Sequence, residues 1–253
     1  YKYFQKPANY YTYDPTNDSY TLVGGFSDKA LMNQTRNIDR VFTGNVSLNY
    51  DKIINEDHQI NALVLYEAIN YSGNWLGGGR TGFLTPAIEE MFGGSTEGMN
   101  INGSAYDMGR KSIVARANYR YKNKYLVETS LRADASAKFP EESRWGYFPS
   151  VSLGWIMTEE GFMQNMGGLE HLKLRASYGQ SGNDAVGNFQ YLSGYQYGLT
   201  NLFSSVEQGI VSTGLANPNL TWEEIAISNV GVDFSFLKRK LYGEADVFYR
   251  TRE

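Results

Sequence analysis

Apolar and polar residues alternate along two neighbouring stretches of the chain, residues 110–121 and 125–134. A period of two residues predicts β-strands with one dry face and one wet face. The three residues between the stretches, 122–124, predict a tight turn, so we expect an antiparallel hairpin. The dry face is predicted to consist of Ile113, Ala115, Ala117, Tyr119, Tyr121, Tyr125, Val127, Thr129, Leu131 and Ala133.

The same alternation predicts eight strands in all. Their lengths are near the roughly 9–11 residues that a tilted strand needs to cross a bilayer. A short helical turn is expected at 162–166, because Thr158 and two acidic residues after it are typical of a helix start. The six strands besides the central pair are predicted at 41–52, 59–71, 145–157, 172–178, 224–236 and 241–250.

The connections between these strands alternate in length. Those at 53–58, 122–124, 158–170 and 237–240 are short, whereas those at 72–108, 135–144 and 180–221 are long, and residues 1–40 are expected to form a preceding long loop. Short periplasmic turns and long extracellular loops are typical of a transmembrane β-barrel. We therefore predict an all-β fold, an antiparallel transmembrane barrel arc of about eight strands, with residues 1–253 forming part of one barrel domain.

In such an arc the dry face meets lipid and the wet face meets the lumen. A soluble sheet alternates in the same way, so the connections and not the alternation favour the barrel. The residues predicted to face lipid are Ile113, Ala115, Val127, Leu131, Val151, Leu153 and Val247. Those predicted to face the lumen are Arg116, Glu128, Arg132, Arg175 and Asp246.

Composition narrows the function classes further. No apolar run approaches the roughly 18 residues of a membrane-spanning helix, so any spanning must use strands. The 15% aromatic content suits rings that gather at membrane interfaces. A net charge of −4 argues against nucleic acid as a partner, and the absence of cysteine excludes disulfides. The chain begins at Tyr1 without a signal peptide and ends within an alternating stretch, so we expect an internal fragment.

Candidates for catalysis are few. His58 and His171 have no second histidine or metal-spaced carboxylate near them, so no catalytic residue, metal ion or cofactor is predicted. Residues 77–82 spell G-x-G-x-x-G, but within an all-β chain we interpret them as a flexible loop. Residues 14–18 offer oxygen ligands for weak Ca²⁺ binding, and an Asx turn is the simpler interpretation.

Candidates for substrate binding lie in the long connections. Sugar rings stack on aromatic faces and accept hydrogen bonds from amide and guanidinium groups. The alternative is that these aromatic residues only pack the loops against one another. The predicted substrate-binding residues are Tyr71, Asn74, Trp75, Arg80, Tyr195 and Tyr197.

Several short motifs follow one another between residues 110 and 250. Their order resembles that in the barrel of the SusC/RagA family of TonB-dependent outer-membrane transporters. One departure is that the run at 133–137 lacks the glycine that the family has in this turn. The motifs are ARANYRYKNKYL at 115–126, LRADASAKF at 131–139, RWGYFPS at 144–150, SLGW at 152–155, EGF at 160–162, LKLRASYG at 172–179, GN at 182–183, LANPNLTWE at 215–223 and DVFYR at 246–250.

The resemblance implies a bacterial outer-membrane importer of glycan or peptide oligomers that is no enzyme. It also implies a SusD-like surface lipoprotein as partner, contact with outer-membrane lipid, and coupling to TonB through a part of the protein outside this chain. Barrels of this kind have about 22 strands around a plugged lumen, so further strands and a plug domain are expected elsewhere.

Two other classes of protein remain open on the residues alone. One is an outer-membrane hydrolase built on a small closed barrel, which requires a convergent set of catalytic groups. The other is a soluble, aromatic-rich carbohydrate-binding β-domain, which requires turns of similar length at both ends of its strands.

Overall fold

The computed structural model describes residues 1–6, 9–25, 29–85, 87–163, 167–202 and 205–253. Strands account for most of these residues. The helical elements in this part of the chain are three single turns of 3₁₀-helix, η1 (Met91–Gly93), η2 (Glu141–Ser143) and η3 (Met157–Glu159). No described helix is long and apolar enough to span a membrane.

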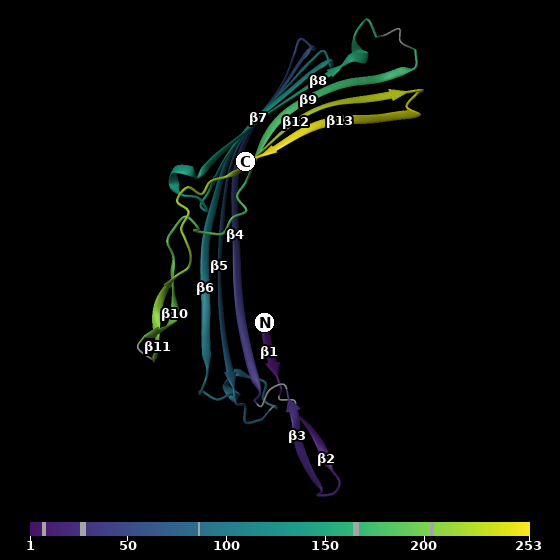
Figure 1. Ribbon diagram of the computed structural model, residues 1–253. Coiled ribbons are helices and arrows are strands. Elements are labelled where there is room, and N and C mark those ends of the chain that lie inside the picture. Colours follow the sequence, from purple (N-terminus) through teal and green to yellow (C-terminus); the bar gives the residue numbers. More distant parts are fainter. Residues whose placement is uncertain (7–8, 26–28, 86, 164–166, 203–204) are drawn as a thin grey trace. The chain divides into compact units, whose positions relative to one another are not determined.

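Nine strands form one sheet in the order β1-β4-β5-β6-β7-β8-β9-β12-β13, and two separate hairpins pair β2 with β3 and β10 with β11 (Figure 1). The strands of the sheet are β1 (Lys2–Gln5), β4 (Leu31–Ile54), β5 (His58–Thr81), β6 (Asn100–Tyr121), β7 (Tyr125–Ser136), β8 (Trp145–Ile156), β9 (Leu169–Asn183), β12 (Glu223–Phe236) and β13 (Leu241–Arg252). The hairpin strands are β2 (Asn9–Asp14), β3 (Ser19–Gly25), β10 (Tyr195–Leu202) and β11 (Ser205–Ser212).

The predicted fold class is confirmed. Strands β4 to β9, β12 and β13 correspond to the eight predicted strands, and each pair with a defined register is antiparallel. Within the described residues the sheet is open, because β1 and β13 end its order without pairing to each other. The chain therefore forms an arc of a barrel wall.

The chain divides into two compact units. The first unit contains Tyr1–Val41 and Tyr71–Asp107, and the second contains Phe42–Asn70 and Met108–Glu253. Strands β4, β5 and β6 belong to both units, with 24, 24 and 22 residues. A tilted strand crosses a bilayer with about 9–11 residues, so roughly half of each of these strands exceeds that need.

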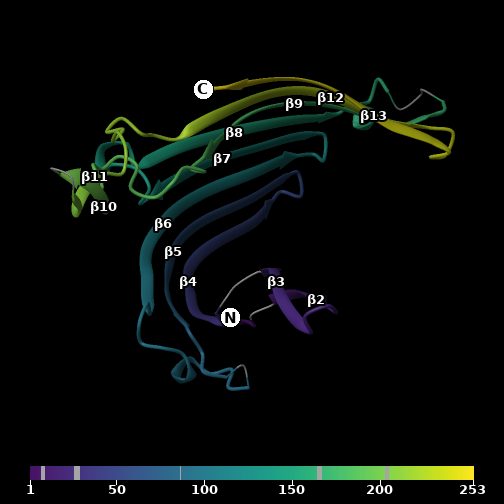
Figure 2. The ribbon, with the colours of Figure 1, turned by 60° about the horizontal axis from the view of Figure 1, so that its bottom comes forward.

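In the second unit, the strands of the large sheet form one curved layer (Figure 2). Its turns are tight where this was predicted. Asn55 and Glu56 have φ of 51° and 61°, and Lys122 and Asn123 have φ of 51° and 54°. Two consecutive residues with positive φ form the type I′ turn that suits the twist of a hairpin. After β12, the carboxylate of Glu170 accepts a hydrogen bond of 2.6 Å from the backbone N–H of Arg239 and fixes the last turn.

The long connections are shorter than predicted, which corrects three expectations. Residues 1–40 are no single loop, because they contain β1, the β2–β3 hairpin and the start of β4. The connection predicted at 72–108 spans only 82–99, since β5 and β6 continue into it. The connection after β9 begins at 184 and contains the β10–β11 hairpin. Strand pairing outweighs the glycines that indicated loops.

The helical turn predicted at 162–166 lies partly outside the described residues, and a single turn of 3₁₀-helix precedes it. The observed turn, η3, spans Met157–Glu159, with Thr158 inside it and no side-chain cap at its start. Residues 161–163 form a turn, and 164–166 lie outside the described residues. The hydroxyl of Thr158 instead accepts a hydrogen bond of 3.4 Å from the backbone N–H of Leu172.

Candidate functional site

The second unit has a continuous polar face and a continuous apolar face. In the register, Val127 pairs with Leu153 and Leu153 with Ala176, while the next row joins Glu128, Ser152 and Ser177. Directly paired residues of an antiparallel sheet point to the same side. The same register places Ile113, Ala115, Leu131, Val151 and Val247 on the side of Val127, and Arg116, Arg132, Arg175 and Asp246 on the side of Glu128. The predicted separation into two faces is confirmed.

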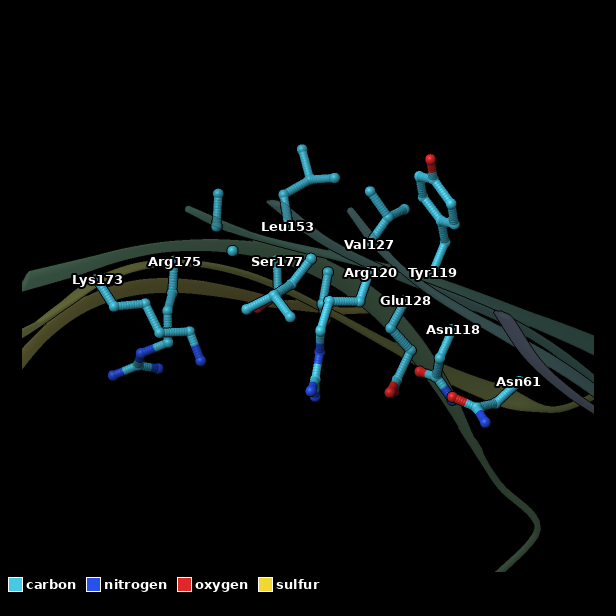
Figure 3. Close-up of a pocket in the computed structure, with 14 residues that line it drawn as sticks. Asn61, Asn118, Tyr119, Arg120, Val127, Glu128, Leu153, Lys173, Arg175 and Ser177 are labelled. Atoms are coloured by element: carbon cyan, nitrogen blue, oxygen red, sulfur yellow. The ribbon is translucent and has the colours of Figure 1, made fainter. Parts of the chain in front are cut away.

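Figure 3 shows these two faces directly. Asn118, Arg120, Glu128, Lys173 and Arg175 lie on the concave side of the curved strands, and the labelled apolar side chains lie on the convex side. The convex side is solvent-accessible in this chain, with Leu153 52% and Val247 79% exposed. An apolar surface of this extent on a sheet is typical of contact with lipid or with another protein.

Aromatic side chains bound the apolar face at two levels. Trp145 and Trp155 are ten residues apart on β8 and so point to the same side. Ten residues span about 33 Å of strand, and a tilt of about 40° reduces this to about 25 Å of height. That height matches the apolar band between the two aromatic girdles of an outer-membrane barrel. Val151 lies near the middle of this band.

A polar hollow of about 510 Å³ occupies the concave face. Gly154 lies at the bottom of the hollow, and its missing side chain leaves room for two neighbours. The Cδ1 atom of Leu126 lies 3.1 Å, and the Cε atom of Lys173 lies 3.2 Å, from the position that a Cβ of Gly154 would take. Long polar side chains from β6 and β9 border it (Figure 3). Within the described residues, the charged groups of Arg120, Glu128 and Lys173 have no ion-pair partner. They are free to contact whatever fills the lumen.

An ion cluster lies beside this hollow. Arg175 contacts Asp233 at 2.8 Å, Asp246 at 3.0 Å and Glu244 at 3.8 Å. The cluster needs a glycine at 231, because a Cβ there would collide with the Asp246 carboxylate and approach Arg175 to 3.0 Å. Three carboxylates surround one guanidinium, so this part of the wall is acidic, whereas the hollow beside it is basic.

Glu160, in the connection after β8, joins this connection to the turn between β6 and β7. Its carboxylate accepts hydrogen bonds from the Tyr125 hydroxyl at 2.7 Å, the Trp155 indole at 3.2 Å and the Lys124 ammonium at 3.2 Å. These donors, the Tyr125 hydroxyl first, hold the pKa of Glu160 below its ordinary value. The site fixes two of the interfacial aromatic side chains.

The predicted binding residues occupy different places from those expected. Tyr71, Asn74, Trp75 and Arg80 lie in strand β5 and not in a loop. Residues 77–81 are also part of that strand, so the interpretation of residues 77–82 as a flexible loop was wrong. Trp75 and Arg80 are five residues apart, so strand alternation places them on opposite faces. The Arg80 guanidinium donates a hydrogen bond of 3.3 Å to the Gly94 carbonyl. The structure therefore does not bring Trp75 and Arg80 together.

Tyr195 and Tyr197 lie on one face of strand β10 in the β10–β11 hairpin. Their side chains are 70% and 79% exposed, and Tyr197 pairs with Ile210 of β11. Both side chains are accessible to a partner.

The remaining candidates have structural roles. His58 Nδ1 lies 2.7 Å from the Tyr119 hydroxyl, and its ring packs at 4.8 Å on Tyr121. His171 pairs with Ser235 in the register, and within the described residues its imidazole makes no hydrogen bond or ion pair. The backbone N–H of Thr16 donates to the Asp14 carboxylate at 2.9 Å, which confirms the Asx turn and lowers the pKa of Asp14.

Comparison with known proteins assigns these features to a family. The family model described as "TonB dependent receptor-like, beta-barrel" matches residues 2–253. The chain belongs to this β-barrel family. Receptors of the family are outer-membrane proteins.

Two curated TonB-dependent receptors illustrate the relationship. TonB-dependent receptor P39 of Formosa agariphila is 34% identical over 206 residues, covering 81% of this chain and 20% of the receptor. TonB-dependent receptor SusC of Bacteroides thetaiotaomicron is 35% identical over 148 residues, covering 56% of this chain and 15% of that protein. The chain thus spans about a fifth of the length of such receptors.

Among solved structures, the RagAB peptide transporter matches with a TM-score of 0.76 and 25% identity, covering 88% of this chain and 24% of that chain. The "closed-closed" state of the RagAB peptide importer matches with a TM-score of 0.77. The resemblance to SusC and RagA is therefore confirmed by sequence and by fold.

In this TonB-dependent receptor barrel, the family motifs meet in one cluster. The ring of Phe148 fills the space above Gly182, and Trp222 packs on it at 5.4 Å between ring centroids. Phe139, fully buried, packs on Trp222 at 5.2 Å. Beside them the Asp184 carboxylate accepts from the Ser136 hydroxyl at 2.8 Å and pairs with Arg110. The motifs spaced along the chain thus fasten the two long connections to the barrel wall.

Proposed function

We propose that this chain is part of the barrel wall of an outer-membrane importer that takes up glycan or peptide oligomers by TonB-dependent transport, together with a SusD-like surface lipoprotein. The observation that carries the proposal is the polar, partly unpaired concave face opposite a lipid-matched apolar band, in a chain whose whole length matches the receptor barrel.

The concave face suits a polar cargo or plug. Its rows combine amides, hydroxyls and charges of both signs, with a basic hollow around Arg120 and Lys173 and an acidic cluster around Arg175. Such a wall offers hydrogen bonds along its length. Water-soluble oligomers therefore suit it better than lipids.

Among the relatives, the RagAB peptide transporter supports a peptide as cargo, whereas the glycan class follows from the resemblance to the SusC/RagA family. RagAB is a peptide transporter, and SusC is named as a TonB-dependent receptor. Both classes of oligomer need a wide passage, and a barrel of about 22 strands encloses one that a plug closes at rest. Energy coupling through TonB is then needed to displace the plug.

The test uses the complete protein in its own bacterium. A strain that lacks the gene is expected to lose growth on one oligomeric nutrient, glycan or peptide, and to regain it with the intact gene. Growth on the corresponding monomer is the control, since monomers pass through general porins. The surface lipoprotein is expected to co-purify with the tagged barrel. Normal growth on all oligomers would contradict the proposal, and hydrolysis of an oligomer by the purified barrel would favour the enzyme alternative.

A further inference from the structure

In the first unit, three glycines of β5 leave room for polar side chains of the neighbouring strands β4 and β6, which lie over β5 at these positions. Gly73, Gly77 and Gly79 lie on the same face of β5 as Trp75, because they differ from it by even numbers of residues. Gly73 and Gly79 are buried although they have no side chain, so neighbouring groups cover them. On this face, Trp75 is therefore the one large side chain of β5 among three positions that have no side chain of their own.

The indole of Trp75 extends along this face. Its Cζ3 atom lies 3.3 Å from the position a Cβ of Gly77 would take, and the Thr35 hydroxyl from β4 lies 3.1 Å from the same position. The Trp75 side chain is 39% exposed. A tryptophan that lies along a strand over a glycine keeps part of its ring accessible to a ligand, and within the described residues its indole N–H has no hydrogen-bond partner.

Two amides meet at one end of this indole. The Asn33 side-chain oxygen from β4 occupies the space above Gly79, and the Asn100 amide from β6 approaches the same space to 3.2 and 3.3 Å. Neither amide has a hydrogen-bond partner in the described part of the chain. Each amide offers two donors and one acceptor oxygen, so together they suit vicinal hydroxyls.

A tyrosine and a carboxylate lie at the other end. The Tyr106 hydroxyl from β6 donates to the Asp39 carboxylate from β4 at 3.2 Å, and both groups lie over Gly73. This hydrogen bond and the adjacent carboxylate raise the pKa of the Tyr106 hydroxyl. The remaining carboxylate oxygen is available as an acceptor.

We propose that Trp75, Asn33, Asn100, Thr35 and Asp39 form an oligosaccharide-binding site. One pyranose ring stacks on the indole, and hydroxyls of the sugar rings on either side of it bond to the amides at one end and to the carboxylate at the other, because the positions of Gly73 and Gly79 are about 20 Å apart along the strand. The proposal rests on the proposed importer function and assigns it a glycan as cargo. The site has an aromatic platform and neutral hydrogen-bonding groups but no unpaired cation within the described residues, so it suits a neutral sugar better than the carboxylate of a peptide.

The test is isothermal titration of the complete transporter, purified in detergent, with four neutral hexasaccharides: maltohexaose, cellohexaose, xylohexaose and mannohexaose. At least one is expected to bind. Trp75→Ala should weaken its binding about tenfold, which corresponds to about 1.4 kcal/mol. The double variant Asn33→Ala/Asn100→Ala should weaken it by at least the same factor.

Two matched variants act as controls. Leu76→Ala removes a side chain that is 57% exposed, more than the 39% of Trp75, from the opposite face of the same strand and should leave binding unchanged. Gly79→Val keeps every binding group but displaces both amides, and should weaken binding as the double variant does. Unchanged migration of the unheated barrel in gel electrophoresis verifies folding of each variant.

The inference is overturned if none of the four hexasaccharides binds, or if Trp75→Ala binds as the unaltered protein does. Its failure is distinguishable from that of the importer function. If the transporter restores growth on peptides but binds no hexasaccharide, the importer function stands and the saccharide site is contradicted. If growth on oligomers does not depend on the gene, both the importer function and this site are contradicted.

Discussion

At the scale of single residues, several glycines of the barrel wall make room for neighbouring side chains. Gly182 is the tightest case, because the Phe148 ring occupies the space of a Cβ. Gly182→Val should destabilise the barrel by about 1–3 kcal/mol, as overpacking does. Gly161→Val is the control, since nothing lies within 4 Å of a Cβ there. Reversible urea unfolding in lipid vesicles measures both, and equal costs would refute the packing described for Phe148.

The two faces of β8 differ in their tolerance of charge. Val151 lies near the middle of the apolar band, so Val151→Arg should cost about 2–4 kcal/mol. Ser152→Arg, one residue later, enters the lumen opposite the unpaired Glu128 and should cost less than about 1 kcal/mol. The same vesicle titration compares them, and a cost at Ser152 as high as at Val151 would count against the assignment of faces.

At the scale of elements, the Glu160 network couples two turns to the interfacial aromatic residues. Because its folded pKa is lowered, the ionised carboxylate stabilises the folded state above the ordinary pKa, and this contribution is lost as pH falls through the folded value. The difference in unfolding free energy between the unaltered protein and Glu160→Gln should therefore be constant near neutral pH and shrink below about pH 4.5. Glu159→Gln, a neighbouring exposed acid, should show no such trend. A difference independent of pH would exclude the ionised network.

Strand periodicity in the sequence predicted all eight long strands and the tight turns, because one wet and one dry face impose a strict period of two. It did not predict how far β5 and β6 extend. Gly77, Gly78 and Gly79 indicate a flexible loop by composition, yet they are strand residues that admit Asn33 and Asn100 from the neighbouring strands. Such contacts depend on which strands pair with one another, and the pattern of residues within one strand does not reveal its pairing partners.

The candidate site shows the same limit. Trp75 was predicted correctly as an exposed aromatic side chain, whereas its predicted neighbour Arg80 lies on the opposite face. The actual neighbours come from β4 and β6, some 25 to 40 residues away along the chain. A signal was present in hindsight, because glycines at every second position beside an aromatic residue mark a strand face that accepts side chains from its neighbours.

At the scale of the whole molecule, the account requires all tight turns to lie on the periplasmic side. This chain contains no cysteine, so single cysteines report topology cleanly once any elsewhere in the complete protein are removed. Asn123→Cys should resist a membrane-impermeant maleimide on intact cells and react after the outer membrane is opened. Gly187→Cys, in the connection after β9, should react on intact cells. Labelling of Asn123→Cys on intact cells would reverse the assigned orientation.

The central claim is that one face of this sheet contacts lipid and the other lines a wet lumen. Spin labels placed singly at residues 150–154 of the complete transporter, reconstituted in lipid vesicles, test it most directly. Labels at Val151 and Leu153 should collide preferentially with oxygen, which concentrates in lipid. Labels at Ser150, Ser152 and Gly154 should collide preferentially with a water-soluble nickel chelate. Equal accessibility of both faces to the nickel chelate would contradict the claim.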